Sequence, residues 1–376
     1  MFSHKYSIFV SVLRNLLTAI ILKTPHFILR EINFTRQIKR NLKMMRSFIL
    51  GYEKRIKDES QTKIDIHINL WRYRASNNND IIIDFGFMIH DIKKVNKIIF
   101  FTPLKINQVL DLGGKIFNSN TISDAIFNER CEISNTYPKR RKVIKHGDYD
   151  SRNNKTEEND VFMIYSLKID RDDNSQLQFN NKDNYSQIHI NTSEILSDEE
   201  VEFHPDLEQV KKYYFRFRIH AKKGTKIIQN ENERINPLQD ISLRTTELID
   251  FRINDLRSCS DEIKECFLKM PIFSINKVHY LIIRNSTDEF ITVGDIKVKS
   301  RILENEVWKD YIKINDIDMI AYHFKNDSDD AFSFEKLARF KYPLNVGKRV
   351  MVYVGIIISI SLISSGIFEI IKKYLI

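Results

Sequence analysis

The stretch from Tyr213 to Lys223 alternates aromatic or aliphatic residues with basic and hydrogen-bonding ones. Read as a strand, it places Tyr213, Phe215, Phe217 and Ile219 on one face. The other face carries a second set, which is Tyr214, Arg216, Arg218 and His220, followed by Lys222 and Lys223. Residues two apart on a strand lie roughly 6.6 Å from each other, near the spacing of successive phosphates in a nucleic-acid strand. The pattern therefore predicts contact with the phosphates of a nucleotide or oligonucleotide, with Tyr214 available for stacking.

Two nearby features extend this candidate site. Lys211 and Lys212 precede the alternating stretch and add positive charge, and Arg252 follows Phe251 on the polar side of a second predicted strand. The net charge of +9, from 59 basic and 50 acidic residues, favours anionic partners in the same way. An ordinary solvent-facing side of a strand would give the same alternation, and the sequence leaves both interpretations open.

The usual signatures of catalysis and metal binding are absent from the sequence. Asp111 to Lys115 reads DLGGK, which lacks the spaced glycine that a phosphate-binding loop needs. No H-E-x-x-H or G-x-S-x-G pattern occurs, and the ten histidines are scattered. Asp316 and Asp318 alternate with apolar residues, as on an exposed strand edge. We therefore expect no enzyme activity, no metal site and no cofactor, although a site assembled from distant residues would leave no such motif.

The cysteines indicate a reducing compartment. There are three of them, Cys131, Cys259 and Cys266, and no C-x-x-C pair. An odd number without paired spacing argues against a disulfide framework and against a cysteine zinc site. This composition favours a cytoplasmic location for the bulk of the chain.

A second polar set lies near the start of the chain. Its members recur at spacings of three and four, so a helix would place them on one face: Ser7, Ser11, Arg14, Asn15 and Thr18. The helix has three interpretations. It packs on its own domain, it lies on or crosses a bilayer, or it assembles with copies of itself so that these residues line a water-filled pore.

The end of the chain predicts a membrane anchor. Residues 350–368 contain no charge and no proline, and as a helix this stretch would span roughly 28 Å, close to the thickness of a bilayer's hydrocarbon core. Lys348 and Arg349 precede it, and Lys372 and Lys373 follow it. A buried core helix is the alternative, but few soluble domains need a helix that is apolar all round. We expect a single C-terminal transmembrane helix in the inner membrane, with the body in the cytoplasm.

Periodicity divides the rest of the chain. Residues 1–57 are predicted to be helical, with a basic heptad-like seam from Ile38 to Ile56. Residues 60–137 are a first β-rich domain that begins with a hairpin, and 108–127 is predicted to be helical within it. Residues 138–160 are a polar basic loop, and 161–345 form a second β-rich domain of short strands. The predicted fold class is α+β, mainly β, with a sandwich-like body.

In its order of parts the chain resembles the membrane effectors of bacterial anti-phage defence. In those proteins a cytosolic module senses a nucleotide or short oligonucleotide and controls a membrane-permeabilising assembly. The resemblance implies a homo-oligomer that acts as an ion channel or disrupts the membrane. The alternative is a tail-anchored scaffold or receptor whose β-rich domain binds a partner protein.

Overall fold

The computed structural model describes residues 45–343 and the helical stretch 350–368, with gaps in both. The gaps are 56–59, 73–80, 135–136, 147–159, 170–174, 197–208, 222–226, 232–243, 292–297, 314–317, 327–330, 344–349 and single positions between 352 and 367. Within the described part the protein is mainly β, with three sheets and few helices, which confirms the mainly-β part of the predicted fold class.

The largest sheet has ten strands in the order β16-β17-β14-β2-β3-β11-β8-β7-β6, and β5 pairs with the later part of β11, beyond the segment that pairs with β8. β2 pairs in parallel with β14 and β8 with β11, while the other neighbours are antiparallel. Its strands are β2 (Lys63–Arg72), β3 (Ile81–Ile89), β5 (Ile106–Asp111), β6 (Arg130–Ile133), β7 (Arg140–His146), β8 (Asp160–Tyr165), β11 (Tyr213–Ala221), β14 (Ser274–Asn285), β16 (Lys299–Ile302) and β17 (Met319–Lys325).

Two four-stranded antiparallel sheets pack on one face of the large sheet. The first has the order β1-β4-β10-β9, and its strands are β1 (Ile49–Lys54), β4 (Val95–Thr102), β9 (Leu177–Asn181) and β10 (Ser186–Asn191). The second has the order β12-β13-β18-β15, and its strands are β12 (Ile228–Glu231), β13 (Arg244–Ile253), β15 (Glu289–Ile291) and β18 (Phe334–Pro343). Strands β13 and β18 pair over their whole length.

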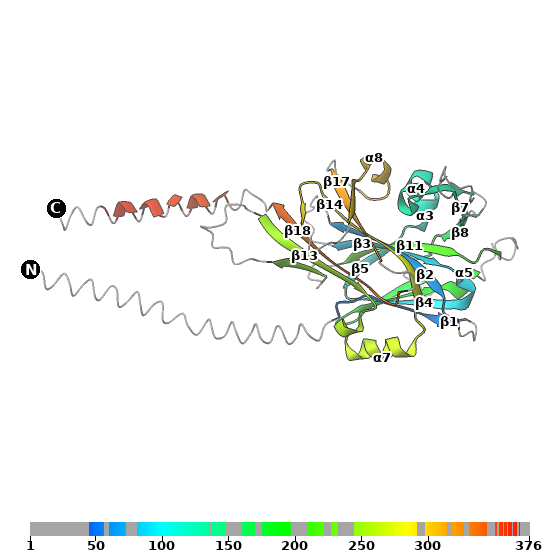
Figure 1. The fold of residues 1–376 in the computed structure, drawn as a ribbon. Coiled ribbons are helices and arrows are strands. Elements are labelled where there is room, and N and C mark those ends of the chain that lie inside the picture. Colours follow the sequence, from blue (N-terminus) through cyan, green and yellow to red (C-terminus); the bar gives the residue numbers. More distant parts are fainter. Residues whose placement is uncertain are drawn as a thin grey trace, which may run out of the picture.

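Short helices complete the body. They are η1 (Ile92–Lys94), α3 (Gly113–Phe117), α4 (Asn120–Phe127), α5 (Thr192–Leu196), η3 (Leu256–Ser258), α7 (Asp261–Lys269) and α8 (Asn305–Trp308). In Figure 1, α3, α4 and α8 lie on the side of the large sheet that is opposite to β1 and β4. The large sheet is therefore covered on both faces, by sheets on one side and by helices on the other.

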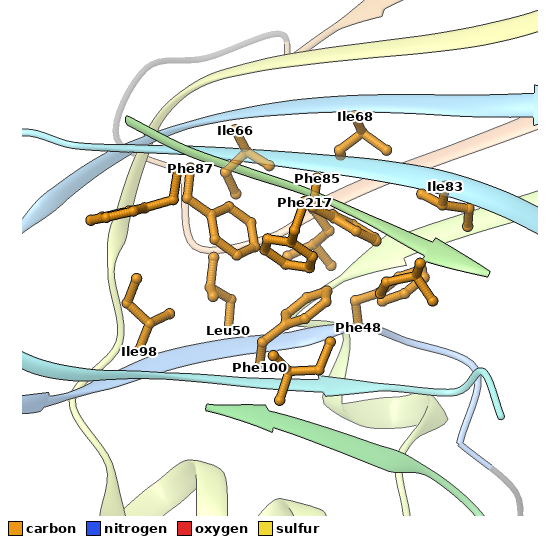
Figure 2. Packing of buried hydrophobic residues seen from close by; sticks show 14 of the residues in the cluster. Phe48, Leu50, Ile66, Ile68, Ile83, Phe85, Phe87, Ile98, Phe100 and Phe217 are labelled. Carbon is orange, nitrogen blue, oxygen red and sulfur yellow. The ribbon is translucent and has the colours of Figure 1, made fainter. Parts of the chain in front are cut away.

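The main hydrophobic core lies between the large sheet and the two smaller ones. Figure 2 shows Phe48 and Phe100 facing Phe85, Phe87 and Phe217 of the large sheet, and all five are almost fully buried. The ring centroids of Phe85 and Phe100 are 4.8 Å apart in an edge-to-face arrangement, which aromatic pairs favour. The predicted alternation of apolar residues on β2, β3 and β11 reflects this core, because one face of each strand points into it.

Three of the predicted elements need correction. The prediction of a helical seam up to Ile56 is wrong for the described residues, because Ile49–Lys54 form β1. The partner strand β4 satisfies the backbone hydrogen bonds along that length. Part of the predicted loop 138–160 is wrong as well, since Arg140–His146 form β7 between β6 and β8. The predicted helix 108–127 is strand β5 as far as Asp111 and becomes α3 and α4 only after Leu112.

The two ranges predicted as separate β-rich domains contribute to one sheet. Strands β2, β3, β5 and β6 of the first range lie in the same ten-stranded sheet as β8, β11, β14 and β17 of the second. The hairpin β2–β3 is confirmed, but it is the centre of the shared sheet.

The C-terminal stretch 350–368 is helical at every described position. None of the helices in the described part of the chain meets the length and apolarity needed to cross a membrane.

Candidate functional site

The basic side chains of β11 are inside the protein. Only 1% of Arg216 and 5% of Arg218 is accessible to solvent, and Tyr214 is fully buried. Contact with a ligand's phosphates requires an exposed guanidinium group, and α3, α4 and the chain around α8 cover this face of the sheet. The alternation of β11 is present as predicted, but its basic face is covered, and Arg216 and Arg218 are not exposed for contact with a ligand.

Asp84 of β3 holds Arg218. The Arg218 Nε donates to Asp84 Oδ1 at 2.6 Å and Nη2 donates to Oδ2 at 3.0 Å, which is the bidentate geometry favoured by a guanidinium and a carboxylate. The Trp71 Nε1 also donates to Asp84 Oδ2, at 2.7 Å. Burial acts to raise the pKa of Asp84, but the charge and hydrogen bonds of Arg218 outweigh it and hold this pKa below its ordinary value.

Tyr311 joins the two arginines. Its hydroxyl accepts from Arg216 Nε at 2.6 Å and donates to Asp84 Oδ2 at 2.9 Å, while its backbone oxygen accepts from Arg218 Nη1 at 3.3 Å. Burial raises the pKa of Tyr311, so its hydroxyl keeps its proton. Tyr311 follows α8 and packs against Trp308, and the arginines therefore fix this covering segment on the sheet.

The network continues into a row of histidines. Arg216 Nη1 donates to the Tyr214 hydroxyl at 2.8 Å, and that hydroxyl lies 3.3 Å from His67 Nδ1. Burial holds the pKa of His67 well below its ordinary value, so this ring is neutral and its Nδ1 can accept a hydrogen bond from the Tyr214 hydroxyl. The His67 ring meets His279 edge-on, and His279 Nδ1 lies 3.2 Å from His323 Nε2.

A surface cleft lies beside this network. Its volume is about 560 Å³, and it opens between α3 and α4 on one side and α8 on the other. Lys115 lines it and donates to the backbone oxygens of Asp310 and Tyr311, both at 3.2 Å. Burial and the charge of Arg218 lower the pKa of Lys115. With Glu306 and Asp310 also on its wall, the cleft has mixed charge and does not favour a strongly anionic ligand.

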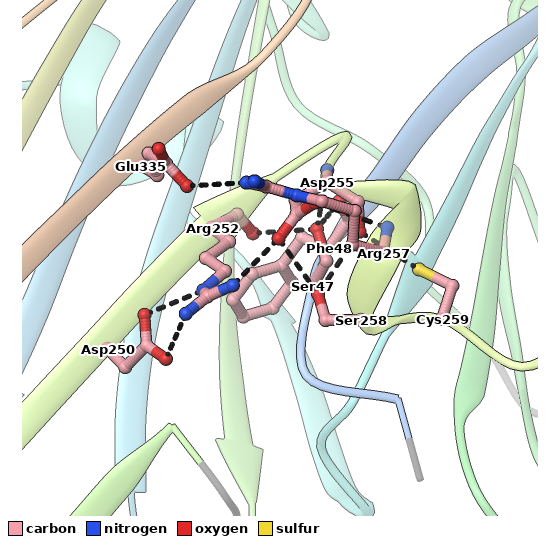
Figure 3. Close-up of polar contacts among 9 residues, drawn as sticks. All are labelled: Ser47, Phe48, Asp250, Arg252, Asp255, Arg257, Ser258, Cys259 and Glu335. Carbon is pink, nitrogen blue, oxygen red and sulfur yellow. Dashed lines mark hydrogen bonds and ion pairs between the residues drawn. The ribbon is translucent and has the colours of Figure 1, made fainter. Parts of the chain in front are cut away.

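Arg252 belongs to a separate cluster on the outer side of β13. Figure 3 shows its guanidinium between Asp250, at 2.8 and 2.9 Å, and Asp255, at 2.8 Å. Asp255 also accepts from Arg257 Nε at 2.8 Å, and Arg257 reaches Glu335 at 3.3 Å. Arg252 is only partly exposed and is already paired, so it is not a neighbour of the β11 arginines in a shared binding surface.

Several predicted site residues lie elsewhere. His220 is partly exposed and is engaged by other groups. The remainder lie outside the described residues, namely Lys222, Lys223 and the predicted pore-lining set Ser7, Ser11, Arg14, Asn15 and Thr18. Nowhere in the described part of the chain do three or more histidine, cysteine or acidic side chains gather as they would around a metal ion.

Sequence reasoning missed the two residues that organise the network. Asp84 is the only charged residue in the apolar run IIIDFGFMI, and a lone carboxylate in a buried strand signals that a cation will be paired with it. Tyr311 gives no such signal, because its position follows from how the chain folds back over the sheet.

No model of a protein family matches this chain, and no curated protein matches it either. The chemistry of the site is therefore argued from its geometry. The arginine network holds the segment around Tyr311 on the sheet, and the cleft lined by Lys115 opens beside it.

Proposed function

We propose that this protein is a membrane-anchored effector of anti-phage defence. Its cytoplasmic β-rich body binds an anionic nucleotide or oligonucleotide, and the ligand controls an oligomer that conducts ions through the inner membrane or disrupts it. The observation that supports the anchor is the exposed apolar surface of the C-terminal helical stretch. The order of parts along the chain supports the remainder of the proposal.

The exposed side chains of this stretch are unusual for the molecule. In the body, large apolar residues are mostly buried in three clusters. In the stretch 350–368, the exposed large apolar residues are Val350, Met351, Val354, Ile357, Ile358, Ile360, Leu362 and Phe368. Apolar surface costs about 25 cal/mol for each Å² left in water, so a run of this kind needs an apolar environment. A bilayer provides one.

The polar set at the start of the chain completes the proposed assembly. Ser7, Ser11, Arg14, Asn15 and Thr18 would face the axis of an oligomer, where their hydroxyl, amide and guanidinium groups stay hydrated. Arg14 is the most informative of them, because a charged side chain in lipid costs about 2.5–3.5 kcal/mol unless it faces water.

Alkaline carbonate extraction of membranes tests the anchor. Replacing both Ile358→Asp and Leu362→Asp adds two charges at about 2.5–3.5 kcal/mol each, and we expect the protein to move from the membrane pellet to the supernatant. The matched control, Ile358→Val with Leu362→Ile, keeps the segment apolar and should remain in the pellet. Wild-type protein that is fully extracted by carbonate would remove the anchor from the proposal.

Mass photometry and vesicle conductance test the assembly. We expect a closed oligomer in detergent, and we expect Arg14→Leu with Asn15→Leu to abolish conductance without changing the oligomer. A monomer or dimer with no conductance would instead favour the tail-anchored scaffold, and the search would turn to a protein partner.

A further inference from the structure

A second groove lies where the ends of β3 and β11 meet the neighbouring strands β7 and β8. Its volume is about 380 Å³, within the range of small-ligand pockets. Its wall is formed by His90, Lys142, Val161, Gln209, Val210, Lys211 and Lys212. The register places these residues together, because Tyr213 of β11 pairs with Ile89 of β3 and with Met163 of β8.

Among the residues that the structure describes, the groove carries surplus positive charge. No carboxylate in the described part of the chain lies within ion-pair distance of Lys142 or Lys211. Lys212 is paired with Asp160, and His90 Nε2 lies 3.0 Å from Asp65 Oδ2. Asp65 also accepts from Asn276 at 2.7 Å, which fixes the carboxylate and through it the His90 ring. Two lysines are therefore left to meet an anion.

The wall of the groove is not uniformly polar. Val161 and Val210 contribute aliphatic surface beside the lysines, and Gln209 adds an exposed amide. An apolar wall adds nothing to the binding of a simple inorganic anion. The base and sugar of a nucleotide, in contrast, bury apolar surface while its phosphates contact cations. The cleft beside Lys115 differs, because Glu306 and Asp310 offset its single lysine.

We infer that this groove binds the phosphates of a soluble nucleotide through Lys142 and Lys211, with His90 and the two valines against the base or sugar. The inference rests on the proposed function and deepens it, since it gives the anionic ligand a site that β11 does not offer. In Figure 1, β7 and β8 lie on the opposite side of the body from β18, after which the chain continues to the membrane stretch. That position favours a soluble ligand over a lipid headgroup.

Lysine acylation footprinting of the full-length protein in detergent tests the site. A mixture of the four common nucleoside triphosphates serves as the probe, and mass spectrometry measures the acylation of each lysine. We expect at least about threefold protection at Lys142 and Lys211, and none at the exposed Lys105 and Lys182, which do not line the groove.

Binding of the same nucleotides by calorimetry provides the second readout. Lys142→Ala with Lys211→Ala should weaken binding by about tenfold or more, because two charge-assisted contacts are lost. Lys105→Ala with Lys182→Ala removes the same charge elsewhere and should change the affinity less than twofold. Equal binding by both double variants, or no binding by the wild type, would overturn the inference.

Two further results separate this inference from the proposed function. Sedimentation with phosphatidylglycerol vesicles that is lost in the Lys142→Ala, Lys211→Ala variant, with no nucleotide protection, would make the groove a lipid site and overturn the inference. Carbonate extraction does not depend on the groove. A protein that remains in the membrane but binds no nucleotide refutes the groove alone, and one that binds nucleotide but is extracted refutes only the anchor.

Discussion

Strands β11 and β13 both carry arginine beside phenylalanine, and the two strands place those arginines in opposite environments. Arg218 lies within the sheet's covered face and shares a fully buried carboxylate with Trp71 and Tyr311. Arg252 lies on an outer face, with 28% of its side chain exposed, and pairs with two carboxylates, of which Asp255 is shared with Arg257. Local sequence sets the alternation on both strands, but the segment that folds over each face decides whether the arginine is buried.

The difference has energetic consequences. Burying an ion pair costs a large desolvation free energy. Removing one partner leaves the other charge unpaired in a medium of low polarity. A partly exposed pair is screened by water and contributes little. We therefore expect the interior network to determine whether the body folds, and the outer cluster to adjust stability only slightly.

The largest effect is expected at Asp84. Asp84→Ala leaves Arg218 without its partner and removes the acceptor of Trp71 and Tyr311, so the free energy of unfolding should fall by about 3–5 kcal/mol. Asp250→Ala leaves Arg252 paired with Asp255 and should cost about 1 kcal/mol or less. Urea unfolding followed by tryptophan fluorescence measures both. Similar losses for the two variants would contradict the contrast between the faces.

Acidification should affect the interior face first. Burial and His323 lower the pKa of His279 to about 4, and burial with Lys325 and Lys299 lowers the pKa of His323 to about 4. Because the ordinary pKa is about 6.5, the unfolded chain binds more protons between pH 6.5 and 4, and stability falls as the pH drops through that window. The groups around the pair are Lys145, Lys325, Lys299, Arg301 and Asp65.

The outer cluster responds at lower pH. Burial acts to raise the pKa of Asp255, but Arg257 and Arg252 lower it below its ordinary value, so its contribution is kept above about pH 4 and lost below it. Urea midpoints at pH 7, 5 and 4 separate the two regions. His279→Gln with His323→Gln should flatten the dependence between pH 6.5 and 4.

Substitution of Gly86 tests the tight packing of the interior network, with a smaller expected loss of stability than Asp84→Ala. A Cβ at this position would lie 2.1 Å from the Tyr214 hydroxyl, which already contacts Arg216 and His67. Gly86→Ala should cost about 1–3 kcal/mol, since the ring has no room to move. Gly51→Ala meets only the flexible end of Met270 and should cost less than about 1 kcal/mol. Calorimetric melting compares the two, and equal costs would show that the Tyr214 ring can shift.

The smallest effect is expected at the rim of the outer cluster. Glu335 and Arg257 are 62% and 78% exposed, and their contact is 3.3 Å long. Glu335→Ala should not change the urea midpoint at moderate salt, because water screens such a pair. A measurable loss would mean that the outer cluster acts as a unit, and a cycle with Arg257→Ala would then measure the coupling.

Most strands could be predicted from the sequence, and the errors have a common cause. The alternation in β2 and β13 is visible in the sequence and predicts both strands, although on β2 the polar side is buried as well. The sequence of β1 predicts a helix because Ile49 and Tyr52 also fit a spacing of three and four, and only pairing with β4 decides between the two periods. The sequence of β7 predicts a loop because Arg140 and Lys142 obscure its alternation of polar and apolar residues, yet Arg140 is fully buried.

The candidate site was predicted less well than the fold. The basic character of β11 is correct, but Arg216 and Arg218 pair with Asp84 and Tyr311, which lie far from them along the chain. Local alternation cannot reveal which distant segment covers a face. The groove could not be predicted from local sequence either. Lys211 and Lys142 are far apart along the chain and become neighbours only through the pairing of β7, β8 and β11.

The parallel pairing of β2 with β14 determines the order in which the body can be made. Ile64 pairs with Ile275, and β14 in turn carries β17 and β16. During synthesis, one edge of the β2–β3 hairpin stays open until the last third of the chain has emerged. Pairings this distant form slowly, and an open apolar edge invites association between chains. The edge of β2 can therefore be covered only after Asn285 has been synthesised, and the strands that follow on β14 are complete only at Lys325.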